Sequence, residues 1–267
     1  MVVVKKVFRV VELVFALIGL VLVLGFFAVK WGLTNTNGIV DNGFNPADTI
    51  DPATLVWNKG EEWEALSTAL TKDEATIYQA SRETGVPARL IVAMIVPEQL
   101  RLFHSEREVF KQIFGPLKIL GNQTQFSWGV AGLKQETAKQ IEENLKATSS
   151  PYYLGVGYEK MLDFKTNNPD EERFNRIADE HDHYYSYLYT ALYLKQVMTQ
   201  WEKSNFPIAN KPEILGTLFN IGFAHSEPKA NPQVGGSQID IGSKTYSFGG
   251  LAYEFYYSPE LIETFPR

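Results

Sequence analysis

Glu98 is the residue of this sequence whose surroundings best suit acid–base chemistry. It follows the unbroken apolar run 91–96 and Pro97. A carboxyl group among apolar side chains keeps its proton to a higher pH than one in water, and a neutral carboxylic acid can protonate the oxygen of a glycosidic bond. Arg101 offers a purely structural alternative, because an i,i+3 ion pair on a helix would lower the pKa of Glu98 instead. Position alone leaves these two interpretations evenly balanced.

A histidine-containing stretch raises the question of a metal site. Glu180, His181, Asp182 and His183 are consecutive, and adjacent side chains on a helix point in different directions, so they cannot easily share one ion. A metal-dependent hydrolase would need another ligand, such as His225. We interpret the stretch as a solvated charged turn and expect no metal and no cofactor. The chain has no cysteine, which also excludes disulfides, thiolate metal sites and thiol nucleophiles.

Three separated segments resemble motifs of one known family. They are TGVPARLIVAMIVPEQ at 84–99, SWGVAGLKQETA at 127–138 and TLFNIG at 217–222. Their order and content resemble the lytic transglycosylase branch of the lysozyme-like superfamily. That family has a helix ending in a Glu-Ser pair, a Ser-x-Gly-Leu-Met-Gln-Ile-x-Pro-x-Thr-Ala turn, and an Ala-Tyr-Asn-Ala-Gly segment. The resemblance covers about residues 75–225.

Single positions within these segments agree with the family or depart from it. In an ungapped alignment the agreeing positions are Glu98, Ser127, Gly129, Thr137, Ala138, Tyr193, Leu194, Asn220 and Gly222. The departing positions are Gly132 in place of Gln, Phe219 in place of Tyr, and Ser186 and Thr190 in place of Asn and Gly.

The resemblance implies a saccharide cleft with one catalytic glutamate and peptidoglycan glycan strands as the substrate. Glu98 would give its proton to the oxygen that links N-acetylmuramic acid to N-acetylglucosamine. The same carboxylate would then take the proton of the muramoyl C6 hydroxyl, so that an anhydro sugar forms without water or a second carboxylate. The substrate-binding residues implied are Ser127, Gly129, Gly132, Tyr193, Phe219 and Asn220.

Two alternatives stay open. A non-catalytic peptidoglycan-binding or scaffolding protein on the same fold is compatible with the departures at Gly132 and Phe219. A hydrolytic muramidase would need a second carboxylate placed for water or for covalent attack, and Asp179 and Asp182 are candidates that the sequence does not place.

The periodicity of apolar residues predicts a mainly α protein with a lysozyme-like helical domain. We expect helices at 61–70, 73–83, 88–114, from about 134, at 169–203 and at 211–219. Gly85 should end the second helix in a left-handed cap, and Pro97 should kink or break the third just before Glu98. The alternation of apolar and polar residues at 235–248 predicts a small C-terminal hairpin.

The N-terminus predicts one transmembrane helix. Residues 13–29 carry no charge, and Lys5, Lys6 and Arg9 precede them, a basic flank that stays in the cytoplasm. A cleaved signal peptide is the alternative. The expected organisation is a cytoplasmic N-terminus at 1–9, a signal anchor at 10–31, a linker at 32–55 and the lysozyme-like transglycosylase domain at 56–267.

This organisation predicts where the protein is located, and the net charge argues against one class of partner. The chain would cross the bacterial cytoplasmic membrane once, with the domain facing the periplasm or cell wall. A net charge of -6 argues against nucleic acid, because nucleic-acid binding depends on lysine and arginine contacts to phosphates.

Overall fold

The computed structural model describes residues 38–46, 50–104 and 127–267, together with isolated positions between 9 and 24. The chain divides into two compact units, Met1–Asn37 and Gly38–Arg267. The predicted anchor at 10–31 lies outside the described residues except at isolated positions. Within the described part, no helix is both long enough and apolar enough to cross a membrane.

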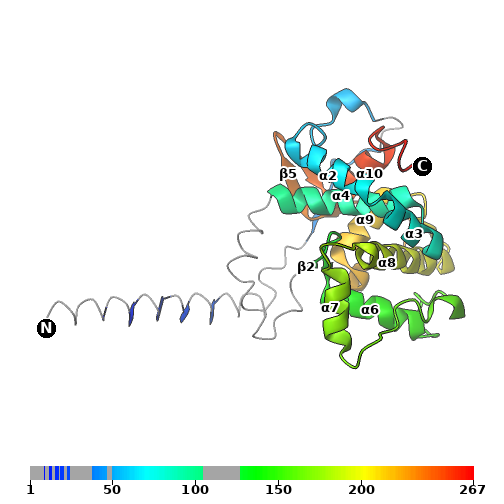
Figure 1. The fold of residues 1–267 in the computed structure, drawn as a ribbon. Coiled ribbons are helices and arrows are strands. Elements are labelled where there is room, and N and C mark those ends of the chain that lie inside the picture. Colours follow the sequence, from blue (N-terminus) through cyan, green and yellow to red (C-terminus); the bar gives the residue numbers. More distant parts are fainter. Residues whose placement is uncertain are drawn as a thin grey trace, which may run out of the picture. The chain divides into compact units, whose positions relative to one another are not determined.

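The second unit is mainly helical, which confirms the predicted class (Figure 1). Its helices of nine residues or more are α2 (Glu61–Lys72), α3 (Glu74–Thr84), α4 (Ala88–His104), α6 (Gln135–Lys146), α7 (Pro169–Ile177), α8 (Tyr184–Lys203), α9 (Pro212–Ile221) and α10 (Phe248–Tyr257). Its strands are β1 (Ile39–Val40), β2 (Ser127–Trp128), β3 (Leu133–Lys134), β4 (Gly235–Gly236), β5 (Gln238–Ile241) and β6 (Lys244–Ser247). The strands form three antiparallel pairs, β1–β4, β2–β3 and β5–β6.

Helix α4 is the centre of the unit, as its apolar sequence predicted. It contacts α2, α3, α8, α9 and α10, and residues 88–98 are all buried. Of the kink or break predicted at Pro97, the break is wrong, because α4 continues through this residue to His104. Pro97 removes one backbone hydrogen bond, but packing of α4 on several sides outweighs that loss. Gly85 ends α3 in the left-handed conformation, with φ of 73°, as expected.

The single helix predicted for 169–203 is two helices, α7 and α8, separated at 178–183. Aspartate side chains make this interruption. Asp179 Oδ1 accepts hydrogen bonds from the backbone N–H groups of His181 (2.8 Å) and Asp182 (3.1 Å), and Asp182 Oδ1 accepts from the N–H of Tyr184 (3.0 Å). Such bonds compete with helical ones, so the chain turns here although the apolar period continues.

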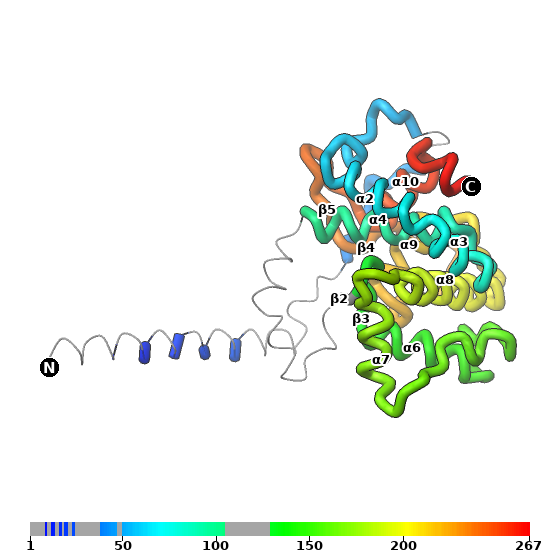
Figure 2. Tube along the Cα trace, viewed as in Figure 1, coloured from blue at the N-terminus to red at the C-terminus, as the bar shows by residue number. Residues whose placement is uncertain are grey.

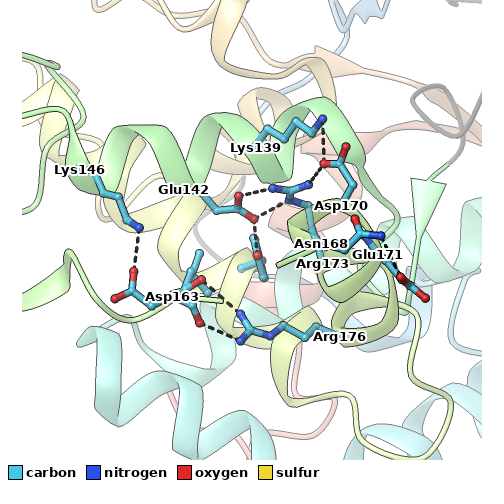
Figure 3. A network of polar contacts seen from close by, with 11 residues as sticks. Lys139, Glu142, Lys146, Asp163, Asn168, Asp170, Glu171, Arg173 and Arg176 are labelled. Carbon is cyan, nitrogen blue, oxygen red and sulfur yellow. Dashed lines mark hydrogen bonds and ion pairs between the residues drawn. The ribbon is translucent and has the colours of Figure 1, made fainter. Parts of the chain in front are cut away.

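A buried polar network holds α6, α7 and α8 together (Figure 3). Arg173 of α7 donates to both carboxylate oxygens of Glu142 on α6, at 2.7 and 2.6 Å. Tyr189 of α8 donates to Glu142 Oε1 at 2.5 Å, and Arg173 also reaches Asp170 at 2.6 Å. Lys139 pairs with Asp170 from the other side at 3.0 Å. Figure 2 shows the traces of α6 and α7 lying beside α8.

A buried arginine organises the C-terminal segment. The Arg89 side chain of α4 is fully buried and donates to the carbonyl oxygens of Phe255, Tyr256, Ser258, Glu260 and Phe265. Desolvation lowers the pKa of Arg89 to about 10. The charge therefore rests on backbone carbonyls and holds the end of α10 against α4.

The predicted hairpin and part of the predicted linker each take part in a small sheet. The predicted hairpin is confirmed, with β5 and β6 paired from Gln238↔Ser247 to Ile241↔Lys244. Part of the predicted linker packs on the domain, because Ile39 pairs with Gly236 and Val40 with Gly235. This pairing joins segments far apart in sequence, and local composition does not reveal it.

Candidate active site

Glu98 lies on α4 with only 3% of its surface exposed. All residues of the apolar run 91–96 are buried around the helix. The expected burial of this carboxyl group is therefore confirmed. A carboxylate in this position needs a charged or hydrogen-bonded partner, because transfer of an unpaired charge from water is costly.

The structural alternative for Glu98 is also met. Arg101 Nη2 lies 2.6 Å from Glu98 Oε1, and Arg101 Nε lies 3.1 Å from Oε2. The Arg101 side chain is itself only 14% exposed. This two-point contact favours the charged carboxylate. The structure thus combines the two settings that the sequence offered as alternatives.

The β2–β3 turn lies directly against Glu98. Gly132 N donates to Gly129 O at 3.2 Å, and both glycines have positive φ, 63° at Gly129 and 60° at Gly132. A Cβ atom at Gly132 would lie 1.9 Å from Glu98 Oε1 and 2.4 Å from its Cδ. Two of the segments that resemble family motifs therefore meet at the carboxyl group, and only glycine fits there.

The other end of the same turn packs on the α7–α8 connection. A Cβ atom at Gly129 would lie 2.1 Å from Ile177 O and 2.3 Å from Ser186 Oγ. Ser186 Oγ donates to Ile177 O at 2.8 Å, which fixes the end of α7. Gln99, the residue after the acid, donates through Nε2 to Val130 O. The turn is thus held between α4 and the end of α7.

Gln135 is a candidate site residue that the ungapped alignment missed. It begins α6, is 3% exposed, and its Oε1 atom is buried without a hydrogen-bond partner in the described part of the chain. A shift of three residues aligns Gly132, Leu133 and Gln135 with the Gly, Leu and Gln of the second family motif. The sequence Gly-Leu-Lys-Gln carried this signal, but the match at Thr137 favoured the other register.

Asn220 and Phe219 end helix α9, which contacts α4. Asn220 Oδ1 accepts from the backbone N–H of Ser237 at 2.7 Å and from Ser237 Oγ at 3.0 Å. The Asn220 carbonyl group therefore ties α9 to the segment before β5. Phe219 is half-buried and packs on the Tyr193 ring, with 5.4 Å between centroids.

Tyr193 requires a correction. Its side chain is fully buried, and its hydroxyl donates to Leu218 O at 2.5 Å. A group without exposed surface cannot contact a substrate in this conformation, so we assign Tyr193 to the support of α9. The backbone of Ser127 lies in β2, opposite Lys134, whereas its side chain lies outside the described residues.

The alternatives that used histidine or aspartate can now be located. His183 Nδ1 lies 2.6 Å from Asp73 Oδ2, so this imidazole pairs with a carboxylate between α2 and α3. Among the described residues, no group of three His, Asp or Glu side chains is arranged to hold a metal ion. Asp179 is exposed, and the backbone N–H groups of His181 and Asp182 hold its pKa below the usual value.

Comparison of the chain with protein-family models, with curated proteins and with solved structures finds no match.

Proposed function

We propose that the domain is a lysozyme-like peptidoglycan lytic transglycosylase and that Glu98 is its acid and base. Glu98 protonates the glycosidic oxygen, the bond to the muramoyl C1 breaks, and an oxocarbenium-like centre develops. The carboxylate then removes the proton of the C6 hydroxyl as that oxygen bonds to C1. The products are a free 4-hydroxyl group on one strand and a 1,6-anhydromuramoyl end on the other.

The contact between Gly132 and Glu98 carries this proposal. The acid and the turn come from separate segments that each resemble a motif of the same family, and the turn lies against the acid with no room for a side chain. A backbone turn in this position limits water around the carboxyl group and presents peptide groups to a bound sugar.

The proposal extends to the fold and the location of the protein. A lysozyme-like arrangement is supported by a buried central helix carrying the acid, followed by a turn and helices in the order that the motifs predict. The signal anchor at 10–31 would keep the domain at the outer face of the bacterial cytoplasmic membrane, facing the periplasm or cell wall, where glycan strands are its partners.

A non-catalytic peptidoglycan-binding protein is the second candidate, and the Arg101 contact favours it. An arginine 2.6 Å from Glu98 Oε1 stabilises the charged form, whereas the reaction requires a proton on this group. For an enzyme, the bound glycan must replace the Arg101 contact before proton transfer. For a binding protein, the pair can persist throughout.

Release of soluble fragments from purified peptidoglycan by the full-length protein separates the two candidates. We expect Glu98→Gln to lower the rate by at least about 100-fold, the scale of general acid catalysis. Glu136→Gln is the matched control, since Glu136 is exposed on the first turn of α6 and should leave the rate unchanged.

Product analysis of the same digest tests the reaction type. Anhydromuramoyl ends support the transglycosylase, and reducing ends support the muramidase. Equal rates for the wild type and Glu98→Gln would refute the catalytic assignment.

A further inference from the structure

A hollow of about 370 Å³ lies beside the candidate acid. Gln99, which follows Glu98, and Val130, within the turn that contacts Glu98, both line it. Leu102 and Phe103 line it from the last turn of α4, and Asp179 and His183 line it from the α7–α8 connection. Its volume is near the lower end for small-molecule sites, which suits one sugar ring.

The apolar part of the hollow contains an exposed aromatic ring. Phe103 is 64% exposed, whereas Leu102 beside it is only 8% exposed. The C–H groups on one face of a pyranose ring pack on an aromatic ring, which buries apolar surface while the sugar hydroxyls stay at the edge. Phe103 is therefore suited to stack against a sugar.

The histidine of the hollow is held in a defined orientation. His183 Nδ1 lies 2.6 Å from Asp73 Oδ2, and Tyr187 donates to the same oxygen at 2.7 Å. Because a carboxylate can only accept, Nδ1 carries a proton, and the other ring nitrogen can hydrogen-bond to a hydroxyl group, which both donates and accepts. The His183 side chain is 24% exposed and lines the hollow, so its ring can contact a ligand there.

Asp179 adds a carboxylate acceptor, which disfavours anionic ligands. Its Oδ1 atom accepts from two backbone N–H groups, and the side chain is exposed where it lines the hollow. Those bonds also hold its pKa below the usual value, so the group is charged at neutral pH. A carboxylate and an imidazole beside an aromatic ring match a ligand that has hydroxyl groups and no negative charge, which describes a neutral sugar ring.

We propose that this hollow is a subsite for one neutral N-acetylhexosamine ring of a glycan strand, with Phe103 stacking on the ring and Asp179 and His183 hydrogen-bonding to its hydroxyl groups. The inference rests on the proposed function, since it places a ring next to the bond that Glu98 would cleave. None of these three residues belongs to the segments that resemble the family motifs.

A neighbouring hollow extends the same surface. It has a volume of about 740 Å³, shares Asp179 with the first, and is lined by α7 residues, by Asn168 and by Tyr185. Two hollows that meet at one carboxylate can accommodate successive parts of a polymer. The glycan strand would therefore continue from Phe103 past Asp179 along α7.

Binding is measured apart from cleavage by titrating tetra-N-acetylchitotetraose, a neutral N-acetylhexosamine tetramer, into the full-length Glu98→Gln protein in a calorimeter. Adding Phe103→Ala should weaken binding by about 3- to 10-fold, the usual range for an aromatic contact. Adding His183→Ala should weaken it by about 5-fold, as for one hydrogen bond. Phe206→Ala and His181→Ala are matched controls, because Phe206 and His181 are partly or fully exposed outside the hollow, and both should bind as the parent does.

Phe103 keeps the test decisive, because its exposed ring can be removed without loss of the fold, which a thermal melt verifies. Unchanged affinity in Phe103→Ala and His183→Ala would overturn the subsite and leave the catalytic proposal intact. Binding of a sugar-free stem peptide with the same dependence on Phe103 would also overturn it. Affinity that depends on Phe103 in a protein that releases no glycan would support the subsite and refute only the catalysis.

Discussion

Two buried glutamate–arginine pairs in this domain differ in what they connect. Glu142 and Arg173 come from α6 and α7, and their contact includes Tyr189 of α8 (Figure 3). Glu98 and Arg101 come from a single turn of α4. The first pair therefore holds three helices together, whereas the second pair joins two residues of the same helix.

The comparison indicates how a structural carboxylate can be separated from a chemical one. Burial is similar, with side-chain exposure of 11% at Glu142 and 4% at Glu98, so burial does not distinguish them. The neighbours do. Glu142 accepts from donors of two other helices, whereas Glu98 lies against a glycine turn, and a Cβ atom added at Gly132 would collide with Glu98.

The largest expected effect is on stability, at Arg173. Among the described residues, Arg173→Met leaves the buried Glu142 carboxylate with Tyr189 as its remaining donor, and the loss of one partner of a buried pair costs about 3–5 kcal/mol. Urea unfolding at neutral pH measures this as a lower midpoint. Lys146→Met removes an exposed pair, 2.7 Å from Asp163, and should cost less than about 1 kcal/mol.

The same unfolding experiment on Glu98→Gln sharpens the comparison. If Glu98 has a chemical role, its replacement should change the unfolding free energy by less than about 1 kcal/mol, because an amide retains hydrogen bonding and avoids charge burial. A loss as large as that of Arg173→Met would contradict the distinction and make Glu98 a structural residue like Glu142.

The next effect is on activity, at Gly132. A methyl group there would collide with Glu98 Oε1, and displacement of a catalytic group by about 1 Å can cost about 100-fold in rate. Gly85→Ala is the matched control. Gly85 also has a positive φ, 73°, but an added Cβ atom would meet only the flexible end of Lys195, at 3.4 Å.

Both alanine variants should lose about 1 kcal/mol of stability from the backbone conformation. Only Gly132→Ala should lose the release of peptidoglycan fragments. Comparable activity in the two variants would show that the turn does not position the acid.

Much of the fold could be predicted because local signals were consistent. The apolar run placed α4 in the core, Gly85 marked a helix end, and the alternation before Phe248 predicted the β5–β6 hairpin. Burial of Glu98 and its pairing with Arg101 were both predictable, because one follows from the preceding residues and the other from i,i+3 spacing.

The errors and the features that were not predicted arose where distant segments or side-chain caps decide the structure. The α7–α8 interruption depends on Asp179 and Asp182, whose hydrogen bonds to the backbone compete with a helix that the apolar pattern continues. The pairing of β1 with β4 joins two segments without any local pattern. Burial of Arg89 depends on carbonyl groups near the other end of the chain, and the burial of Tyr193 depends on the packing of α9.

The smallest effect concerns the exposed edge of the structural network, at Asp170. Hydrogen bonds from Lys139 and then Arg173 lower the pKa of Asp170, so the charged form is preferred in the folded protein. This contribution is fully present above the pKa of an unfolded aspartate, about 4, and is lost as the pH falls through the lower folded value. The Asp170 side chain is 56% exposed, so solvent screening keeps the effect small.

Asp170→Asn tests that sign directly. The difference in unfolding free energy between the wild type and Asp170→Asn should be constant from pH 7 to about pH 5 and should shrink as the pH falls below about 4. A difference that is independent of pH would mean that Asp170 acts through hydrogen bonding alone. Glu142 would then be the charged partner on which Arg173 depends. The whole loss of unfolding free energy in Arg173→Met would be assigned to the Glu142–Arg173 contact, and the contrast with the pair within α4 at Glu98 would become sharper.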